Sequence, residues 1–217
     1  MTTMSRSTES PIEGLHASPP SPLPFAPSLH IRAFLLRRRA GNVLIYAAPG
    51  ADAALFAGVG GIARVYLNHR HEAAFGDDLP GVPLYVHEAD RAATARTRPV
   101  RAAFTRRHVL NGDLEVIPTP GHTPGATAYL WDGGAHRFLF TGDTIYLRHG
   151  EWVAAVLDSS DRAAYLESLE LIRGLDFDVL VPWAAGAGEA PHAVTDRADA
   201  RRRVDAIIER IRRGDDR

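Results

Sequence analysis

Short runs of apolar, β-branched and aromatic residues recur along the chain from Leu29 onward, and turn-forming residues separate them. Runs of this length and composition, bounded by glycine, proline, asparagine or aspartate, are typical of β-strands. The pattern predicts strands over residues 30–37, 42–48, 63–68, 83–88, 113–119, 126–132, 136–142 and 178–182.

Helical periodicity is clearest near the C-terminus. Ser160 is positioned to cap a helix over residues 161–173, and Thr195 a helix over residues 196–213. The apolar residues of the second helix fall at i, i+3, i+4 and i+7 and share one face: Val204, Ile207, Ile208 and Ile211. A helix with one apolar stripe packs against a sheet, which favours a layered α/β body, with two sheets face to face and helices outside as one solution.

The N-terminal segment has a different composition. Residues 1–27 are rich in serine and proline and include the stretch "SPPSPLPFAP". Such a composition is typical of a polyproline-like arm, so we expect this segment to lie outside the fold. The remaining residues, 28–217, belong to a chain that is 45% apolar and 24% charged, and we expect them to form a single domain with one sizeable core.

Composition excludes several kinds of chemistry. The chain has no cysteine, which excludes disulfides, thiolate metal ligands and a thiol nucleophile, and no lysine, which excludes Schiff-base chemistry. A formal net charge of −1 provides no field that would gather nucleic acid. No run approaches the roughly 20 apolar residues of a membrane span. We therefore expect a cytoplasmic protein that binds neither nucleic acid nor a membrane.

Histidines and an aspartate stand at the predicted strand ends. His69 and His71 follow one strand at i and i+2, and on an extended segment this spacing aims both rings the same way. His122 lies in the tight turn "TPGHTPG", and Asp143 ends the strand "LFTGD". Three imidazoles and a carboxylate suit a zinc-type ion, which takes nitrogen and oxygen ligands in a tetrahedral shell.

The stretches that carry these residues resemble the successive motifs of the metallo-β-lactamase superfamily: "LIYAAPG", "LNHRHEAA", "IPTPGHTPGATAYL", "LFTGDT" and "DVLVPWAAGAG". The resemblance implies a four-layered αββα sandwich of the α/β (α+β) class, with a metal site at the edge where the two sheets meet. It also implies that His69, His71 and His122 hold the first metal of the family's pair. Asp143 matches the aspartate that bridges the two metals.

The chain departs from the family pattern at the second metal. The family's Asp-His pair falls on Ala73 and Ala74, and its last histidine is replaced by Ala184 or Ala185. A methyl group cannot coordinate a cation, so the site resembles one half of a binuclear centre. Tyr46 stands where the family has an aspartate that helps to organise the site, which implies weaker support for the ligands.

The first functional hypothesis is a hydrolase with one zinc ion that acts on an ester, thioester or lactone. In it Asp143 or its water completes the coordination shell, and metal-bound water attacks the substrate. Asp143 and Glu72 are the candidate catalytic residues, with Glu72 as a substitute for the aspartate lost at Ala73, provided that its side chain turns inward.

Two alternatives remain open. His69, His122 and Asp143 form a two-histidine, one-carboxylate set of the kind that holds iron in non-haem oxygenases, and the persulfide dioxygenase branch of the superfamily is similar. The other alternative is a non-catalytic member that keeps the fold, with or without a bound ion, and serves as a binding or structural protein.

Further residues are candidates for the pocket around the metal. His87, Tyr146, Trp183 and His192 follow the metal motifs or stand in their loops, and Trp152 with Tyr146 is expected to form an apolar wall for a small-molecule substrate. Trp183 is a candidate to fill the space of the second metal, and His192 to replace the missing ligand. A homodimer is a further expectation.

Overall fold

The computed structural model describes residues 9–215. Its strands are β1 (Glu9–Ile12), β2 (Leu15–Ala17), β3 (Ser21–Leu23), β4 (Ala26–Ile31), β5 (Phe34–Leu36), β6 (Val43–Ile45), β7 (Arg64–Tyr66), β8 (Leu84–His87), β9 (Ala102–Phe104), β10 (His108–Leu110), β11 (Leu114–Pro118), β12 (Thr127–Asp132), β13 (Arg137–Gly142), β14 (Tyr146–Arg148), β15 (Glu151–Val153), β16 (Val179–Pro182), β17 (Ala184–Gly186) and β18 (Ala193–Val194). Its helices are α1 (Ala53–Phe56), α2 (Glu88–Thr94), α3 (Arg162–Gly174) and α4 (Arg197–Arg212), with short 3₁₀ turns η1 (Ala57–Val59) and η2 (Arg70–Ala74).

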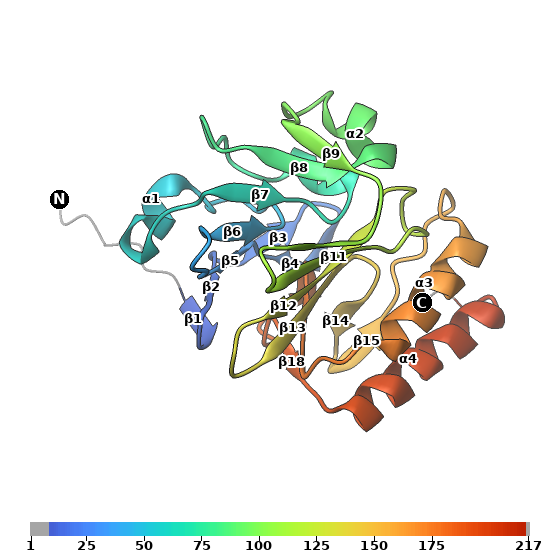
Figure 1. The fold of residues 1–217 in the computed structure, drawn as a ribbon. Helices are drawn as coiled ribbons and strands as arrows, with labels where there is room; N and C mark the ends of the chain where they lie inside the picture. The colour runs from blue at the N-terminus through green and yellow to red at the C-terminus, as the bar shows by residue number, and fades with distance from the viewer. Residues whose placement is uncertain (1–8, 216–217) are drawn as a thin grey trace.

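Two large sheets form the centre of the molecule. One has the strand order β1-β2-β5-β6-β7-β8-β9, and the other β10-β11-β12-β13-β16-β18. Helices α3 and α4 cover the outer side of the second sheet, whereas α1 and α2 lie on the side of the first (Figure 1). Two small sheets, β17-β4-β3 and β14-β15, complete the body. This arrangement confirms the predicted αββα sandwich.

Alternation along the strands divides the apolar residues between two cores. On β12, Tyr129 belongs to the core between the sheets, and its neighbours Ala128 and Leu130 belong to the core beneath α3 and α4. Successive side chains of a strand point to opposite faces, so a continuous apolar run marks a strand that is buried on both faces. The apolar stripe of α4 is buried in the second of these cores, as its spacing predicts.

Each predicted strand is present, with two differences of detail. The predicted strand over residues 30–37 is interrupted and forms β4 and β5, which belong to different sheets. The two long helices begin one residue later than predicted: Asp161 caps α3 and Asp196 caps α4, rather than Ser160 and Thr195. In both caps a carboxylate accepts backbone N–H groups of the first turn, and its charge also suits the helix N-terminus.

The N-terminal segment differs from its expectation over residues 9–27. These residues form β1, β2 and β3 and the start of β4, and β2 pairs with β5 inside the seven-stranded sheet. Leu15 and Ala17 are buried while His16 between them is half-buried, which is the alternation of a strand. The surrounding prolines hid this short pattern. Residues 1–8 of the predicted arm lie outside the described residues.

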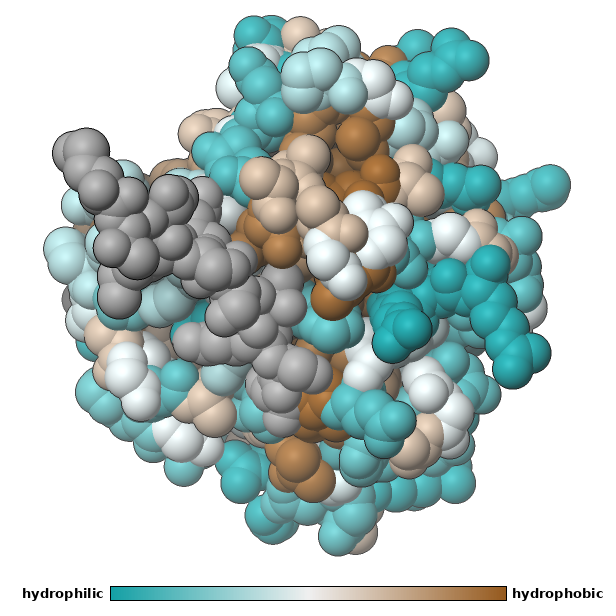
Figure 2. Space-filling model, turned by 90° about the vertical axis from the view of Figure 1, so that its left-hand side faces the viewer, coloured by the Kyte–Doolittle hydropathy of each residue, from teal (hydrophilic) through white to brown (hydrophobic). Residues whose placement is uncertain are grey.

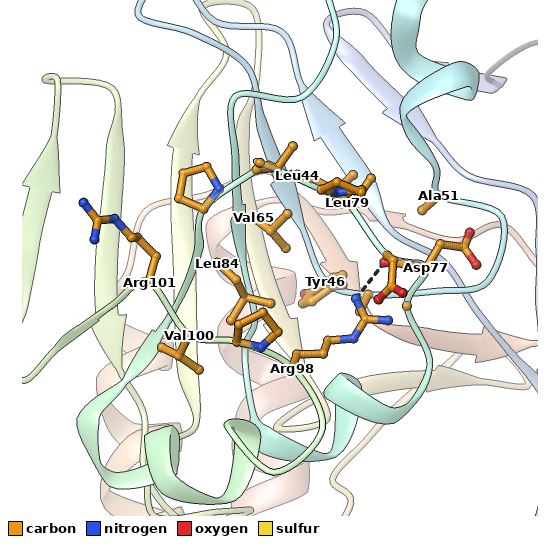
Figure 3. Close-up of a pocket in the computed structure, with 18 of the residues that line it drawn as sticks. Leu44, Tyr46, Ala51, Val65, Asp77, Leu79, Leu84, Arg98, Val100 and Arg101 are labelled. Atoms are coloured by element: carbon orange, nitrogen blue, oxygen red, sulfur yellow. Dashed lines mark hydrogen bonds between the residues drawn. The ribbon is translucent and has the colours of Figure 1, made fainter.

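The helical cover of the seven-stranded sheet is short. Its α1 and α2 have 4 and 7 residues, against 13 and 16 for α3 and α4. A cavity of about 830 Å³ remains over this sheet, and its lining includes Leu44, Val65 and Leu84 (Figure 3). These three residues are paired across the neighbouring strands β6, β7 and β8. Hydrophobic residues also gather in a band on the face of the molecule that is turned toward the viewer in Figure 2. Within residues 9–215, no helix has the length and apolar content that crossing a membrane requires.

Candidate metal centre

His69 and His71 follow the end of β7. His69 has an extended backbone and caps η2, and His71 lies in the first turn of η2. The predicted extended segment is therefore a 3₁₀ turn, and the two rings lie nearly perpendicular, with their centroids 5.1 Å apart. The turn nevertheless aims both rings at one place, because ligand atoms of His69, His71 and His122 all lie within 4.8 Å of one another.

His122 comes from the loop between β11 and β12. Gly121 has a φ of +142°, and a Cβ at this position would collide with the backbone of Tyr165 in α3, so only glycine lets the loop pass so close to the helix. The Nδ1 atom of His122 donates to the carbonyl of Ala155 at 2.7 Å. This bond fixes the ring, and it leaves Nε2 to face the other histidines.

Asp143 follows Gly142 at the end of β13. Its Oδ2 atom lies 3.4 Å from Nε2 of His69 and 3.6 Å from Nε2 of His122. Its side chain keeps 18% of its surface exposed, while the side chains of His69 and His122 keep 0% and 1%. Asp143 is therefore more open than His69 and His122, and His71 is likewise only half-buried.

Three of the distances between these donor atoms are close to those around a tetrahedral ion. Bonds of about 2.0–2.1 Å place the ligand atoms of a tetrahedral zinc about 3.3–3.4 Å apart. Nδ1 of His71 lies 3.2 Å from Nε2 of His122, and the two distances to Asp143 are 3.4 and 3.6 Å. The buried Nε2 of His69 has no hydrogen-bond partner among the residues that the structure describes. A buried polar atom is normally paired, so this nitrogen is the one positioned to meet an ion.

The charges of the group are distributed unequally. Burial opposes a charge on His69, but the carboxylates of Asp143 and Glu72 outweigh it and raise its pKa to about 10. Burial and the neighbouring His69 and His122 lower the pKa of His71 to about 4. Burial and the charge of His69 also lower the pKa of His122. Burial opposes ionisation of Asp143, yet the facing histidines leave its pKa lowered. At neutral pH, His71 and His122 are neutral and can act as ligands.

Glu72 is fully buried behind His69. One carboxylate oxygen accepts the backbone N–H of Asn68 at 3.0 Å and lies 3.1 Å from Nδ1 of His69. The other oxygen accepts the backbone N–H of Ala47 at 3.2 Å. The carboxylate therefore lies on the Nδ1 side of the ring, away from the Nε2 atom that faces Asp143.

Asp90 in α2 is a buried residue that the sequence analysis did not single out. It accepts the backbone N–H of Arg70 at 3.0 Å, the hydroxyl of Thr123 at 2.6 Å and the backbone N–H of Gly125 at 3.2 Å. It therefore ties the η2 turn to the His122 loop. An acidic residue in the first turn of a helix is ordinary, so the sequence carries no signal of this role.

Tyr46 supports the strand end that presents Asp143. Its buried hydroxyl donates to the carbonyl of Val181 at 2.7 Å and accepts the N–H of Gly142 at 2.8 Å. Its φ of +71° is rare for a residue with a side chain. The Tyr46 hydroxyl thus links β16 to the end of β13, next to Asp143.

The other side of the histidine group is apolar. The indole N–H of Trp183 donates to the carbonyl of Ala47 at 2.8 Å, and its ring lies 5.5 Å from His69 and 5.4 Å from Phe75, between centroids. Ala73 is buried next to this group and Ala74 is exposed. Ala184 and Ala185 are buried in β17.

The remaining pocket candidates have separate places. His87 caps α2, with Nδ1 accepting the N–H of Ala89 at 3.2 Å. His192 is half-buried, and the metal-ligand group found among residues 9–215 does not include it. Tyr146 is half-buried at the start of β14. Trp152 was expected to wall the substrate pocket, and this was wrong: it is buried in the core beneath α3 and α4, where it stacks on Phe177.

Comparison with solved structures shows the same fold. A metallo-β-lactamase from Erythrobacter litoralis has a TM-score of 0.70 at 15% identity, covering 96% of this chain and 98% of that one. A metallo-β-lactamase family protein from Thermus thermophilus has a TM-score of 0.65 at 18% identity, with 94% and 81% covered. For an archaeal metallo-β-lactamase superfamily protein from Sulfolobus tokodaii the TM-score is 0.59 at 17% identity, with 90% and 86% covered.

Sequence comparison identifies the family. A search of the curated proteins finds no significant match. The family model of the metallo-β-lactamase superfamily matches residues 30–184, a span that contains the histidine group, Asp143 and Trp183. The chain therefore belongs to the metallo-β-lactamase superfamily.

Proposed function

We propose that this protein is a metal-dependent hydrolase with a single zinc ion, acting on a small ester, thioester or lactone. The observation that carries the proposal is the spacing of the donors: His71 and His122 present nitrogens 3.2 Å apart, and the Asp143 carboxylate lies 3.4 and 3.6 Å from the Nε2 atoms of His69 and His122.

The residues have distinct roles in this proposal. His69, His71 and His122 would hold the ion, with Asp143 beside it. A zinc ion bound in this way lowers the pKa of its water to about 7, which supplies a nucleophile at neutral pH. Asp143 has a lowered pKa and is therefore ionised, so its carboxylate can accept a hydrogen bond from that water and orient it. Its partial exposure leaves room for a substrate on the same side.

The apolar side of the group supports one ion rather than two. Trp183 and Phe75 pack there, and Ala73 and Ala74 offer no donor atom. A second cation in such surroundings would lose its hydration without gaining ligands. The reaction would therefore proceed without a second cation to steady the leaving group, which favours substrates whose leaving group departs readily.

An iron site is the second candidate. His69, His122 and Asp143 approach one another as a two-histidine, one-carboxylate set. The third imidazole, from His71, lies within reach of the same ion and favours a tetrahedral zinc shell. Zinc-loaded protein that is silent while anaerobically iron-loaded protein consumes oxygen with a persulfide would reverse this preference.

The proposal is tested with a panel of ester, thioester and lactone substrates and zinc-loaded protein. We expect activity in the wild type and none in His122→Ala, which should fold normally but lose zinc affinity by more than the roughly 10–100-fold cost of removing a residue that only supports a ligand. His108→Ala, which alters a histidine outside the cluster, should behave as the wild type. An inert wild type across the panel would contradict the proposal.

A further inference from the structure

Glu72 is a buried acid, and its position leaves no room for it to act as a base on a substrate. The side chain has no exposed surface, and both oxygens point at protein groups. Burying a carboxylate is costly unless hydrogen bonds compensate it. Here the backbone N–H groups of Ala47, Asn68 and His69 do so, at 3.2, 3.0 and 3.3 Å. A carboxylate so completely bonded is fixed in one position.

The fixed carboxylate faces one ligand. Its Oε1 atom lies 3.1 Å from Nδ1 of His69, and the amide oxygen of Asn68 lies at the same distance from Nδ1. Both groups are acceptors, so Nδ1 must carry a proton, and in the neutral ring the lone pair then resides on Nε2. Nε2 is the buried atom without a hydrogen-bond partner among the described residues, and it faces Asp143 at 3.4 Å.

We propose that Glu72 is a positioning residue that orients His69 and increases its basicity toward the metal, not the base of the reaction. The inference rests on the proposed metal site. A carboxylate that accepts the free N–H of a metal-bound histidine fixes the tautomer and the ring and strengthens the ligand. Glu72 makes this contact from the η2 turn.

The hydrogen bond from Ala47 to Glu72 indicates which missing family residue Glu72 helps to replace. Its second oxygen binds the N–H of Ala47, the residue directly after Tyr46. The carboxylate therefore lies at the end of β6, where the family resemblance places an aspartate and this chain has a tyrosine. Two residues together replace that aspartate, because Tyr46 holds the strand end of Asp143 and Glu72 supplies the negative charge behind His69.

The Asn68 amide oxygen competes with the Glu72 carboxylate for the N–H at Nδ1 of His69, and the carboxylate is the stronger acceptor. Hydrogen bonds to an ionised acceptor are about twice as strong as those between neutral groups. The Asn68 amide nitrogen donates to the carbonyl of Thr127, so the amide contributes to the local packing in any case. The charge on Glu72 is thus the feature to remove.

The experiment compares zinc affinity, by competition with a chromophoric chelator, in the full-length wild type, Glu72→Gln, Glu72→Asp and Asp178→Asn. Asp178 provides the matched control, because it also accepts from Nδ1 of a histidine, His136, at 2.8 Å, outside the metal group. We expect Glu72→Gln to lose about 10–100-fold in affinity and to alter the visible spectrum of the cobalt-loaded protein. Glu72→Asp should recover part of the affinity, and Asp178→Asn should match the wild type.

A second measurement needs no variant and covers the case in which Glu72→Gln does not fold. Long-range ¹H–¹⁵N NMR of the wild type reports which nitrogen of His69 carries the proton, and we expect Nδ1–H in the zinc-loaded protein. A proton on Nε2, or an unchanged zinc affinity and cobalt spectrum in folded Glu72→Gln, would overturn the inference while leaving the metal site in place. A wild type that binds no zinc would overturn the proposed function as well.

Discussion

The two sides of the histidine group are built from opposite kinds of residue. On one side three of the four candidate ligands have a polar support: Glu72 behind His69, the Ala155 carbonyl behind His122, and the Tyr46 hydroxyl behind the strand end of Asp143. On the other side are Trp183 and small apolar residues. Burying polar groups is costly. In a fold that bound no ion, groups whose only role is to position metal ligands would lower the stability without any return in function.

On the proposed function, the missing donor atoms on the apolar side do not imply that the polar side has decayed. In a pocket that had lost its function, we would expect buried polar supports to give way to hydrocarbon. Instead, Asp90 binds the η2 turn and the His122 loop, and Glu72 accepts the N–H of Ala47 next to Tyr46. The predictions below test this division.

The largest expected effect is on the apolar side. Trp183→Ala should lower the free energy of unfolding by about 3–5 kcal/mol, because it leaves a cavity beside Phe75. Folded protein should still bind one zinc ion, as measured by elemental analysis alongside chemical denaturation. Trp152→Ala removes a buried tryptophan from the other core and is the control. Zinc lost in the Trp183 variant but kept in the Trp152 variant would mean that the apolar side also serves the ion.

A carboxylate on the apolar side should be harmful. Ala73 is buried and its neighbour Ala74 is exposed, which gives a matched pair. Ala73→Asp should cost about 3 kcal/mol, because it places an unpaired charge beside apolar residues. Ala74→Asp should cost under about 0.5 kcal/mol. If excess zinc restored the stability of Ala73→Asp and raised the metal content to two per chain, the space for a second ion would still exist.

The polar side can be weakened without touching a ligand ring. Asp90→Asn should lower the free energy of unfolding by about 1–3 kcal/mol, since it disturbs the bonds to Arg70, Thr123 and Gly125. Zinc affinity of the folded variant, measured by chelator competition, should fall less than in Glu72→Gln, because Asp90 contacts no ligand ring. An equal or greater loss of zinc affinity would mean that Asp90, and not Glu72, is the main residue that orders the site.

The last prediction concerns the dependence of stability on pH. The pKa of His69 is raised in the metal-free fold to about 10, from 6.5. A raised pKa stabilises the fold fully below pH 6.5, and the contribution is lost as the pH rises through 10. Thermal melts of metal-free protein should therefore show a loss of stability between these values that zinc-loaded protein lacks, because the ion replaces the proton on Nε2. Parallel curves would contradict the placement of that proton.

The features that could be predicted from the sequence are those that depend on local residue patterns. Strand alternation located the sheets, and turn residues located His122 and Asp143 at strand ends, where the structure has them. It did not reveal Asp90 or the support by Tyr46, because both depend on residues more than 30 positions apart that meet only in the folded chain. The strands before residue 27 were missed because prolines interrupt a pattern of three or four residues.

Metal content per chain, measured by elemental analysis on protein purified without added metal or nickel affinity, tests the central claim most directly. The account predicts one zinc ion per chain in the wild type and none in His122→Ala. Two ions per chain would show that the apolar side still binds metal. No ion, with none taken up on dialysis against zinc, would contradict the claim that the polar side was kept to hold one.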